Sequence, residues 1–234
     1  MKILAIECSA IPASCAIFED GRLVSSSFAN VKLTHSETLV PMVESALKNA
    51  KLGLDEIDTF AVSCGPGSFT GIRIGISAVK GLAIKGSKPC CAVSTLLSMA
   101  YRLCHLNGII CGVMDARCNQ VYNALFRCEN GIITRLCDDR ALMTDELICE
   151  IEQFKNDPVY IIGDGADLFY EKAKHLENTI KVCQTLKYQH AEGVALAAFD
   201  MIKENNTVSP EALLPFYLRL PQAERELKQK RGEN

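Results

Sequence analysis

The most informative stretch of the sequence reads Cys64-Gly65-Pro66-Gly67-Ser68-Phe69-Thr70-Gly71-Ile72-Arg73-Ile74-Gly75. The apolar run 59–64 before the turn predicts a strand, and the periodicity of 72–85 after it predicts a helix. A glycine-rich turn that opens a helix presents free backbone N–H groups, which attract anions. A tight turn with Ser68 or Thr70 as the helix N-cap is the alternative. No Gly-Lys-Ser/Thr follows, which excludes a P-loop. The candidate loop residues are Gly65, Gly67, Ser68, Thr70, Gly71 and Arg73.

The residues around this stretch predict a mixed α/β unit. Asp20-Gly21 is a strong hairpin signal between two β-rich runs. Apolar residues at helical spacing follow from His35. The predicted strands are 2–8, 14–18, 22–28, 59–64 and 88–93, and the predicted helices are 35–51, 72–85 and 94–105.

The same order of elements then begins again. Predicted strands at 108–115, 120–127, 132–137 and 158–162 alternate with predicted helices at 144–155, from 167, and at 190–204. Three strands, helix, strand, helix therefore occurs twice, which predicts a duplicated α/β fold of two βββαβα halves. We expect an N-terminal half at 1–106, a C-terminal half at 107–220 and a polar tail at 221–234, with a ligand cleft between the halves. One irregular α/β domain is the alternative.

Composition and charge narrow the function classes. The chain has 234 residues, 48% of them hydrophobic, and a net charge of −3. It lacks the basic footprint of a protein that binds nucleic acid alone, so a nucleic-acid role would need a partner. No apolar stretch reaches the ~18 residues of a membrane span. The 12 cysteines form no CxxC pair and no metal-ligand spacing with a histidine. We therefore expect no metal site and a reduced, cytoplasmic protein with buried thiols.

Small residues follow one side of the second predicted helix. Glycine inside a helix costs roughly 0.5–1 kcal/mol relative to alanine, so the close approach of another helix would explain it. Ordinary packing within the chain is the alternative. The predicted partner interface consists of Leu39, Val40, Met42, Val43, Ala46 and Leu47 on the first helix with Gly71, Gly75, Ala78 and Leu82 on the second.

Three further turns resemble the nucleotide-binding turns of actin-like ATPases and sugar kinases. In that superfamily the phosphate turns are Asp-x-Gly, whereas here Glu7-Cys8-Ser9 and Asp115-Ala116-Arg117 carry side chains at the glycine positions. A Cβ there impedes close approach to a phosphate. A degenerate nucleotide cleft would contain Glu7, Ser9, Asp115, Arg117, Gly163 and Gly165. The four histidines are scattered and no GxSxG elbow is present, so no catalytic residue is predicted.

The motifs together resemble the bacterial TsaB family, in order and over nearly the whole chain. Besides 64–75, the resemblance rests on Ile3-Leu4-Ala5-Ile6-Glu7-Cys8-Ser9, Val93-Ser94-Thr95-Leu96, Asp115-Ala116-Arg117 with Val121-Tyr122, and Pro215-Phe216-Tyr217-Leu218-Arg219. It implies the actin/Hsp70/sugar-kinase fold. It also implies a part in forming N6-threonylcarbamoyladenosine (t6A) at position 37 of tRNAs that read ANN codons.

The resemblance also implies partners. In that system a paralogue, TsaD, holds a metal through two histidines on a helix and transfers the threonylcarbamoyl group, and TsaE is an ATPase. TsaB is the partner that TsaD needs, paired through helices of its N-terminal half, and it can pair with itself when alone. The segment that would align with the TsaD metal helix, 93–100, contains no histidine here.

We therefore expect a non-catalytic scaffold subunit that pairs with a TsaD-like subunit, works with a TsaE-like ATPase and meets tRNA through the complex. No cofactor should bind tightly to this chain, and ATP or ADP would matter only for the complex. An active ATPase or kinase that uses Glu7 and Asp115 for Mg²⁺ is one alternative. A glycoprotease-like peptidase is the other.

Overall fold

The first half of the chain forms a sheet with helices on both faces. The structure, a computed structural model, describes residues 1–31 and 33–219. The elements of the first half are β1 (Lys2–Glu7), β2 (Ala13–Glu19), β3 (Arg22–Ala29), α1 (His35–Ala50), β4 (Thr59–Gly65), α2 (Phe69–Ile84), β5 (Cys90–Ser94) and α3 (Thr95–Tyr101), with one 3₁₀ turn at Leu54–Glu56.

The second half repeats this plan. Its elements are β6 (Gly108–Asp115), β7 (Gln120–Glu129), β8 (Ile132–Arg135), β9 (Arg140–Met143), α4 (Thr144–Ile151), a 3₁₀ turn at Glu152–Phe154, β10 (Val159–Ile162), α5 (Ala166–Ala173), β11 (Thr179–Lys181) and α6 (Ala191–Lys203). The short strands β9 and β11 are not among the elements that the sequence predicts.

The two sheets share one topology. The first has the order β3-β2-β1-β4-β5 and the second has the order β8-β7-β6-β10-β11. In both, the first three strands are antiparallel neighbours. The fourth and fifth strands then join parallel to the first. The predicted duplication is therefore confirmed at the level of strand order and direction, with β9 as an addition that pairs with β7.

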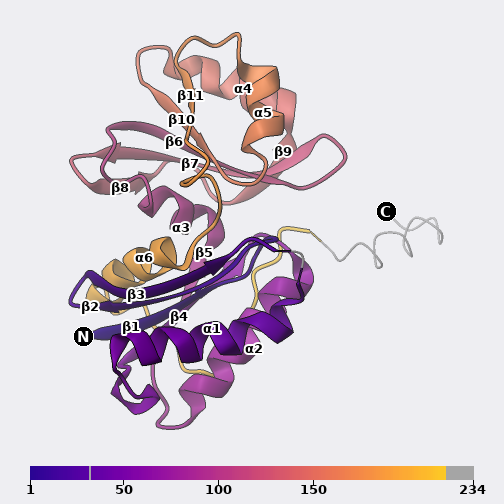
Figure 1. The fold of residues 1–234 in the computed structure, drawn as a ribbon. Helices are drawn as coiled ribbons and strands as arrows, with labels where there is room; N and C mark the ends of the chain where they lie inside the picture. Colours follow the sequence, from indigo (N-terminus) through magenta and orange to yellow (C-terminus); the bar gives the residue numbers. More distant parts are fainter. Residues whose placement is uncertain (32, 220–234) are drawn as a thin grey trace, which may run out of the picture.

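Helices separate the sheets into layers, as Figure 1 shows. α1 and α2 cover the outer face of the first sheet, while α3 and α6 lie between the two sheets. One core joins α1 and α2 to the first sheet through Leu39, Val43, Ile72 and Val79. α4 and α5 cover the far face of the second sheet.

Helix α6 corrects one predicted boundary. We expected residues 107–220 to form the second half, but α6 packs on the first sheet, where Val194 and Ala198 contact Ile3 and Ala16. Gly193 permits close packing against α3, since a Cβ there would lie 2.0 Å from the carbonyl oxygen of Ser98. The apolar, small-residue face of α6 completes the core of the first half.

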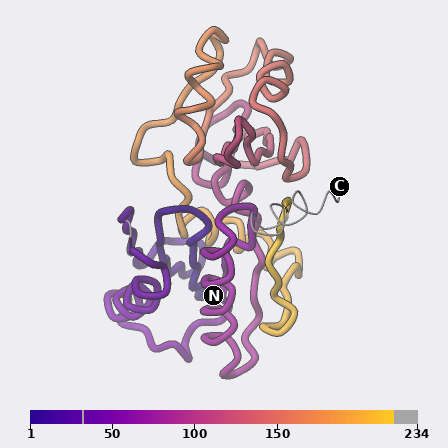
Figure 2. Tube along the Cα trace, turned by 90° about the vertical axis from the view of Figure 1, so that its right-hand side faces the viewer, coloured from indigo at the N-terminus to yellow at the C-terminus, as the bar shows by residue number. Residues whose placement is uncertain are grey.

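The chain after α6 also returns to the first half, along a path drawn in yellow in Figure 2. We call residues 204–219 the C-terminal strap. Val208 and Cys90 exchange two backbone hydrogen bonds of 2.8 Å, and Leu213 is fully buried in the core. The strap then reaches the glycine-rich turn, where the Phe216 N–H donates to the Cys64 carbonyl at 2.7 Å. The predicted tail 221–234 lies outside the described residues.

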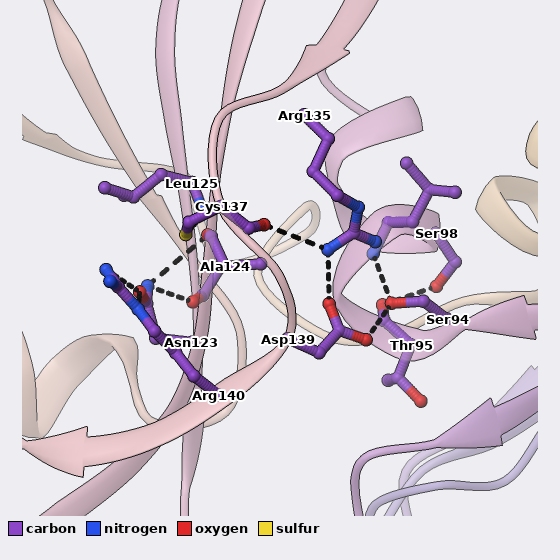
Figure 3. A network of polar contacts seen from close by, with 12 residues as sticks. Ser94, Thr95, Ser98, Asn123, Ala124, Leu125, Arg135, Cys137, Asp139 and Arg140 are labelled. Atoms are coloured by element: carbon purple, nitrogen blue, oxygen red, sulfur yellow. Dashed lines mark hydrogen bonds and ion pairs between the residues drawn. The ribbon is translucent and has the colours of Figure 1, made fainter. Parts of the chain in front are cut away.

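A polar network connects the two halves on the α3 side (Figure 3). The Ser94 hydroxyl donates to Asp139 at 2.6 Å and accepts the Leu97 N–H as the N-cap of α3. Arg135 forms an ion pair with Asp139 at 2.6 Å and lies over the Phe126 ring. No helix in the described part of the chain is long and apolar enough to cross a membrane.

Candidate functional site: the cleft between the halves

A cleft of about 700 Å³ lies between the two halves. The first half contributes the β1–β2 turn, the β3–α1 loop and the glycine-rich turn, and the second half contributes the β6–β7 turn and the 163–166 loop. The residues that line this cleft include Ser9, Gly67, Ser68, Asp115, Arg117, Asp164, Tyr217 and Arg219.

Backbone from other parts of the chain occupies the space beside Gly65 and Gly67, where other residues would carry a Cβ. Gly65 has φ +127°, and a Cβ there would lie 2.1 Å from the Phe216 carbonyl oxygen. Gly67 has φ +154°, and its Cβ would lie 2.4 Å from the Ser9 carbonyl oxygen. The two glycines therefore admit the backbone of the strap and of the β1–β2 turn. The Gly65–Pro66 peptide bond is cis.

The start of α2 follows the simpler of the two sequence interpretations. Ser68 is the N-cap, and its hydroxyl accepts the Gly71 N–H at 3.2 Å. The Ser68 N–H donates to the Ser9 carbonyl at 2.6 Å. Arg73 lies over the Phe69 ring, 3.8 Å from its centroid, and donates to the Tyr217 hydroxyl at 2.9 Å. These contacts direct Arg73 to the strap.

Glu7 is enclosed by its own half. The residue has no exposed surface. One carboxylate oxygen accepts the Ser9 N–H at 2.6 Å, and the other accepts the Ser63 hydroxyl. Burial raises the pKa of Glu7 because it removes the hydration of the charged carboxylate, although the hydrogen bonds of Ser63 and Ser9 and the nearby His35 oppose the shift. Glu7 therefore presents no free carboxylate to the cleft.

The second half offers exposed and half-buried acids. The exposed Asp115 accepts the Arg117 N–H at 2.7 Å. Asp164 accepts a hydrogen bond from Gln189 at 2.8 Å, and burial raises the pKa of its carboxyl. Gly163 and Gly165 let the 163–166 loop lie against β6, since a Cβ on Gly163 would be 2.0 Å from the Val113 carbonyl oxygen.

The tertiary structure thus brings the predicted cleft residues Ser9, Asp115 and Arg117 around one cavity, beside the glycine-rich turn. Glu7 lies beneath that cavity, Gly163 packs on β6, and Gly165 lines a smaller neighbouring hollow. Sequence reasoning missed Tyr217 and Arg219 as cleft residues. The motif Pro215–Arg219 was the available signal, but its sequence does not say where the strap lies.

The predicted partner interface needs a correction. Leu39, Met42, Val43 and Ala46 are buried against the chain's own first sheet. Gly71 and Gly75 are buried at the end of β1, where a Cβ on Gly75 would lie 2.5 Å from the Cys8 sulfur. The close approach that these glycines allow is therefore made by β1. The helical spacing identified the apolar side of α1 correctly, but the first sheet of the same chain covers that side.

Other residues of the same two helices remain on the surface. Val40 is 53% exposed, and Leu47, Ala78 and Leu82 are half-buried. Gly81 is exposed, and a Cβ placed there would meet no atom within 4 Å. The outer side of these two helices, which pack together, therefore carries exposed apolar and charged residues and one open glycine.

Metal and thiol chemistry find little support among the described residues. Residues 1–31 and 33–219 hold no group of three histidine, cysteine or acidic side chains that could bind a metal ion. All twelve cysteines are free thiols, and seven of them are buried. Burial raises the pKa of the Cys15 and Cys64 thiols to about 12, so these thiols remain protonated at neutral pH.

Comparison with known proteins identifies the relatives of this chain. The model of the TsaD family, tRNA N6-adenosine threonylcarbamoyltransferase, matches residues 29–227. The Bacillus subtilis tRNA threonylcarbamoyladenosine biosynthesis protein TsaB is 31% identical over 96% of both chains. The Escherichia coli TsaB protein is 31% identical over 94% of this chain and 95% of its own length.

Solved structures agree with the sequence relatives. A Pseudomonas aeruginosa protein described as similar to the peptidase YeaZ has a TM-score of 0.79 at 27% identity, and covers 93% of this chain and 99% of its own. A hexokinase from Thermus thermophilus, with a TM-score of 0.50 at 12% identity over 87% of this chain and 100% of its own, shares the fold alone. The predicted actin/Hsp70/sugar-kinase-like class is thereby confirmed. With full-length relatives at this identity, the chain belongs to the TsaB family.

Proposed function

We propose that this chain is a non-catalytic subunit of the machinery that forms t6A at position 37 of ANN-decoding tRNAs, where it supports a TsaD-like catalytic subunit. Its family membership names the pathway. The observation that carries the non-catalytic role is the glycine-rich turn, whose open positions are occupied by the backbone of Ser9 and Phe216.

The residues of the cleft do not fit the ATP and Mg²⁺ that the fold family implies. Glu7 is buried with both carboxylate oxygens accepting hydrogen bonds, so a cation would have to displace them. Arg117 stands at the glycine position of the second turn, with φ +63°. Any role of ATP or ADP belongs to the assembled complex.

Peptidase activity, which the name of one solved relative suggests, needs an activated nucleophile. In residues 1–31 and 33–219 no histidine ring hydrogen-bonds to a serine or cysteine side chain. The His35 ring donates to the Ala10 carbonyl, and His175 contacts the Lys172 carbonyl. His190 caps α6 instead. These contacts support the scaffold role over the peptidase alternative.

Pairing would use the exposed sides of α1 and α2. Val40 and the half-buried Leu47, Ala78 and Leu82 belong to these two helices, and Gly81 on α2 leaves an open position where a partner helix can approach closely. In the absence of the catalytic subunit, two copies of this chain pair through the same face. The TsaE-like ATPase and the tRNA join at the level of the complex, in the cytoplasm.

Reconstitution tests this function. The TsaD-like subunit, the TsaE-like ATPase, threonylcarbamoyl-adenylate and an ANN-decoding tRNA are combined with and without this chain, and t6A is measured. We expect product only when the chain is present, and no ATP hydrolysis by the chain alone. Undiminished product without it would refute the proposed role, and Mg²⁺-dependent ATP turnover by the isolated chain would favour the kinase or ATPase alternative.

A further inference from the structure

The C-terminal strap touches three parts of the molecule that are distant in sequence. It pairs with β5, it stacks on the start of α2, and its last described residue holds the β6–β7 turn of the other half. We propose that the strap couples the partner face on α2 to the β6–β7 turn on the opposite wall of the cleft. The part of this inference that concerns the partner rests on the proposed function.

Three contacts between residues 208 and 216 fix the strap to the first half. Val208 pairs with Cys90, and the Lys80 ammonium donates to the Glu211 carbonyl at 3.1 Å. Further along, the Phe216 N–H donates to the Cys64 carbonyl at the end of β4. Because β4 and α2 flank the glycine-rich turn, the strap moves with that turn.

Tyr217 connects the strap to the outer side of α2. Its ring stacks on Phe69 with 4.6 Å between the centroids, and its hydroxyl accepts a hydrogen bond from Arg73. Arg73 is exposed on α2, so a protein that docks on this helix can reach its guanidinium. A docked partner that draws Arg73 away, or packs it more firmly, acts directly on Tyr217.

Arg219, two residues after Tyr217, contacts the β6–β7 turn of the second half. Its guanidinium donates to the Ala116 carbonyl at 2.9 Å and to the Gln120 side-chain oxygen. Between those two residues the backbone is left-handed at Arg117 (φ +63°), Cys118 (φ +52°) and Asn119 (φ +60°). Non-glycine residues disfavour this conformation, so such a turn persists only where its surroundings hold it.

Arg219 is one of several groups that hold this turn. The Lys172 ammonium donates to the Asn119 side-chain oxygen, and the Gln120 N–H donates to the Arg117 carbonyl. The Thr144 N–H and hydroxyl contact the Asn119 carbonyl from the second half, and the Ala116 N–H bonds Gln120. Arg219 is the contact that comes from the strap. The chain of contacts Arg73–Tyr217–Arg219–Ala116 therefore links the two sides of the cleft.

Hydrogen–deuterium exchange of the full-length free protein tests the coupling first. Arg219→Ala should speed amide exchange in the 114–122 peptide by about fivefold or more, the lower end of typical couplings. Arg73→Ala should also speed amide exchange in the 114–122 peptide, although Arg73 does not contact that peptide. The double variant should match Arg219→Ala alone, because both changes break one linkage. The matched controls are Lys85→Ala, at the far end of α2, and Arg22→Ala on β3.

The outcomes are distinct. An unchanged 114–122 peptide in Arg73→Ala, or additive effects in the double variant, would overturn the coupling. Thermal unfolding of each variant identifies a general loss of stability, which would speed exchange in every peptide rather than in this one.

The partner arm then uses the TsaD-like subunit. Its binding should slow exchange of the 114–122 peptide in the wild-type protein and leave it unchanged in Arg219→Ala, while both proteins still bind. Equal slowing in both would overturn the role of the strap. If the wild-type chain does not bind this subunit at all, the proposed function fails, and the coupling is decided by the free-protein arm.

Discussion

At the scale of single residues, Glu7 is a fully buried carboxylate. One of its oxygens accepts the Ser9 N–H and the other accepts the Ser63 hydroxyl. Burial raises the pKa of Glu7 above its ordinary value. In this chain the Glu7 carboxylate is engaged at the end of β1 by these two hydrogen bonds.

The first prediction concerns Glu7→Gln. Because the pKa is raised in the folded state, the folded chain binds more protons than the unfolded chain above the ordinary carboxyl pKa, and stability falls as the pH rises through that window. Gln keeps one acceptor and adds a donor for Ser63. We expect Glu7→Gln to be more stable than the wild type at about pH 7 and similar to it at about pH 4. Urea unfolding at both pH values measures this, and a wild type that is more stable at neutral pH would contradict it.

The second prediction compares two glycines. Gly65→Ala combines φ +127° with a Cβ 2.1 Å from the Phe216 carbonyl oxygen. It should displace the strap and cost about 1–3 kcal/mol or more of unfolding free energy. Gly81→Ala is the matched control, since its Cβ meets nothing within 4 Å. It should gain about 0.5–1 kcal/mol as a helical glycine replaced by alanine. Thermal or urea unfolding would refute this account if both variants changed stability alike.

At the scale of elements, α1 and α2 each have a buried and an exposed side, and the two sides serve different purposes. Leu39 is 1% exposed in the core, whereas its neighbour Val40 is 53% exposed. The buried side holds each helix on the sheet. Only the exposed side can meet another protein without unfolding the first half.

The third prediction separates these sides on α1. Leu39→Ala should cost about 2–5 kcal/mol because it empties a core position. Val40→Asp should change stability by about 0.5 kcal/mol or less, as surface substitutions do, and weaken pairing with the TsaD-like subunit. Urea unfolding and calorimetric titration measure the two effects. Normal pairing by Val40→Asp would mean that α1 is not part of the partner face.

The fourth prediction concerns the open position on α2. Gly81→Leu should fold like the wild type, because nothing lies within 4 Å of its Cβ, and should obstruct a closely packed partner helix. Gly81→Ala adds only a methyl group and should pair more strongly than Gly81→Leu. Sedimentation of the chain alone measures self-pairing, and titration measures pairing with the TsaD-like subunit. Equal affinities for both variants would place the interface elsewhere.

At the scale of the whole molecule, the two halves are not independent in sequence. α6 and the strap come after the second sheet in the chain, yet they cover the first sheet and its glycine-rich turn. The second half is thereby inserted between two parts of the first. The cleft wall formed by the strap exists only when the chain has folded back.

The fifth prediction follows from this return. A fragment of residues 1–106 leaves Ile3, Ala5, Ala16 and Phe18 without the α6 residues that bury them. It should be unfolded or aggregated, because an uncovered apolar face of this kind is not stable in water. Circular dichroism and NMR of the fragment test this against the full-length chain. A cooperatively folded fragment would show that α6 is dispensable for the first half.

Much of the fold could be predicted from the sequence, because secondary structure depends on patterns within one window. The apolar and β-rich runs in 2–28 and the helical spacing at 35–51 each predicted the observed elements correctly from neighbouring residues. The repeated order of elements predicted the duplication. β9 and β11 were missed because they have only four and three residues, too few to establish a period.

The candidate site was predictable in part. Motif spacing identified the glycine-rich turn and the β6–β7 turn, which do meet at one cleft. Motif spacing did not distinguish a glycine that leaves room for a phosphate from one that leaves room for another backbone segment. In both cases the position must lack a Cβ. Nor did the apolar side of α1 reveal whether a sheet or a second protein covers it.

The sequence by itself determined the family, the two α/β halves and the presence of side chains at Ser9 and Arg117, because these depend on residue identity and local order. Only the tertiary structure decided what lines the cleft and which side of each helix is exposed. The physical reason is sequence distance. Phe216 meets Gly65, Arg219 meets Ala116, and α6 meets β1 across more than a hundred residues of chain, and no local pattern encodes contacts of that range.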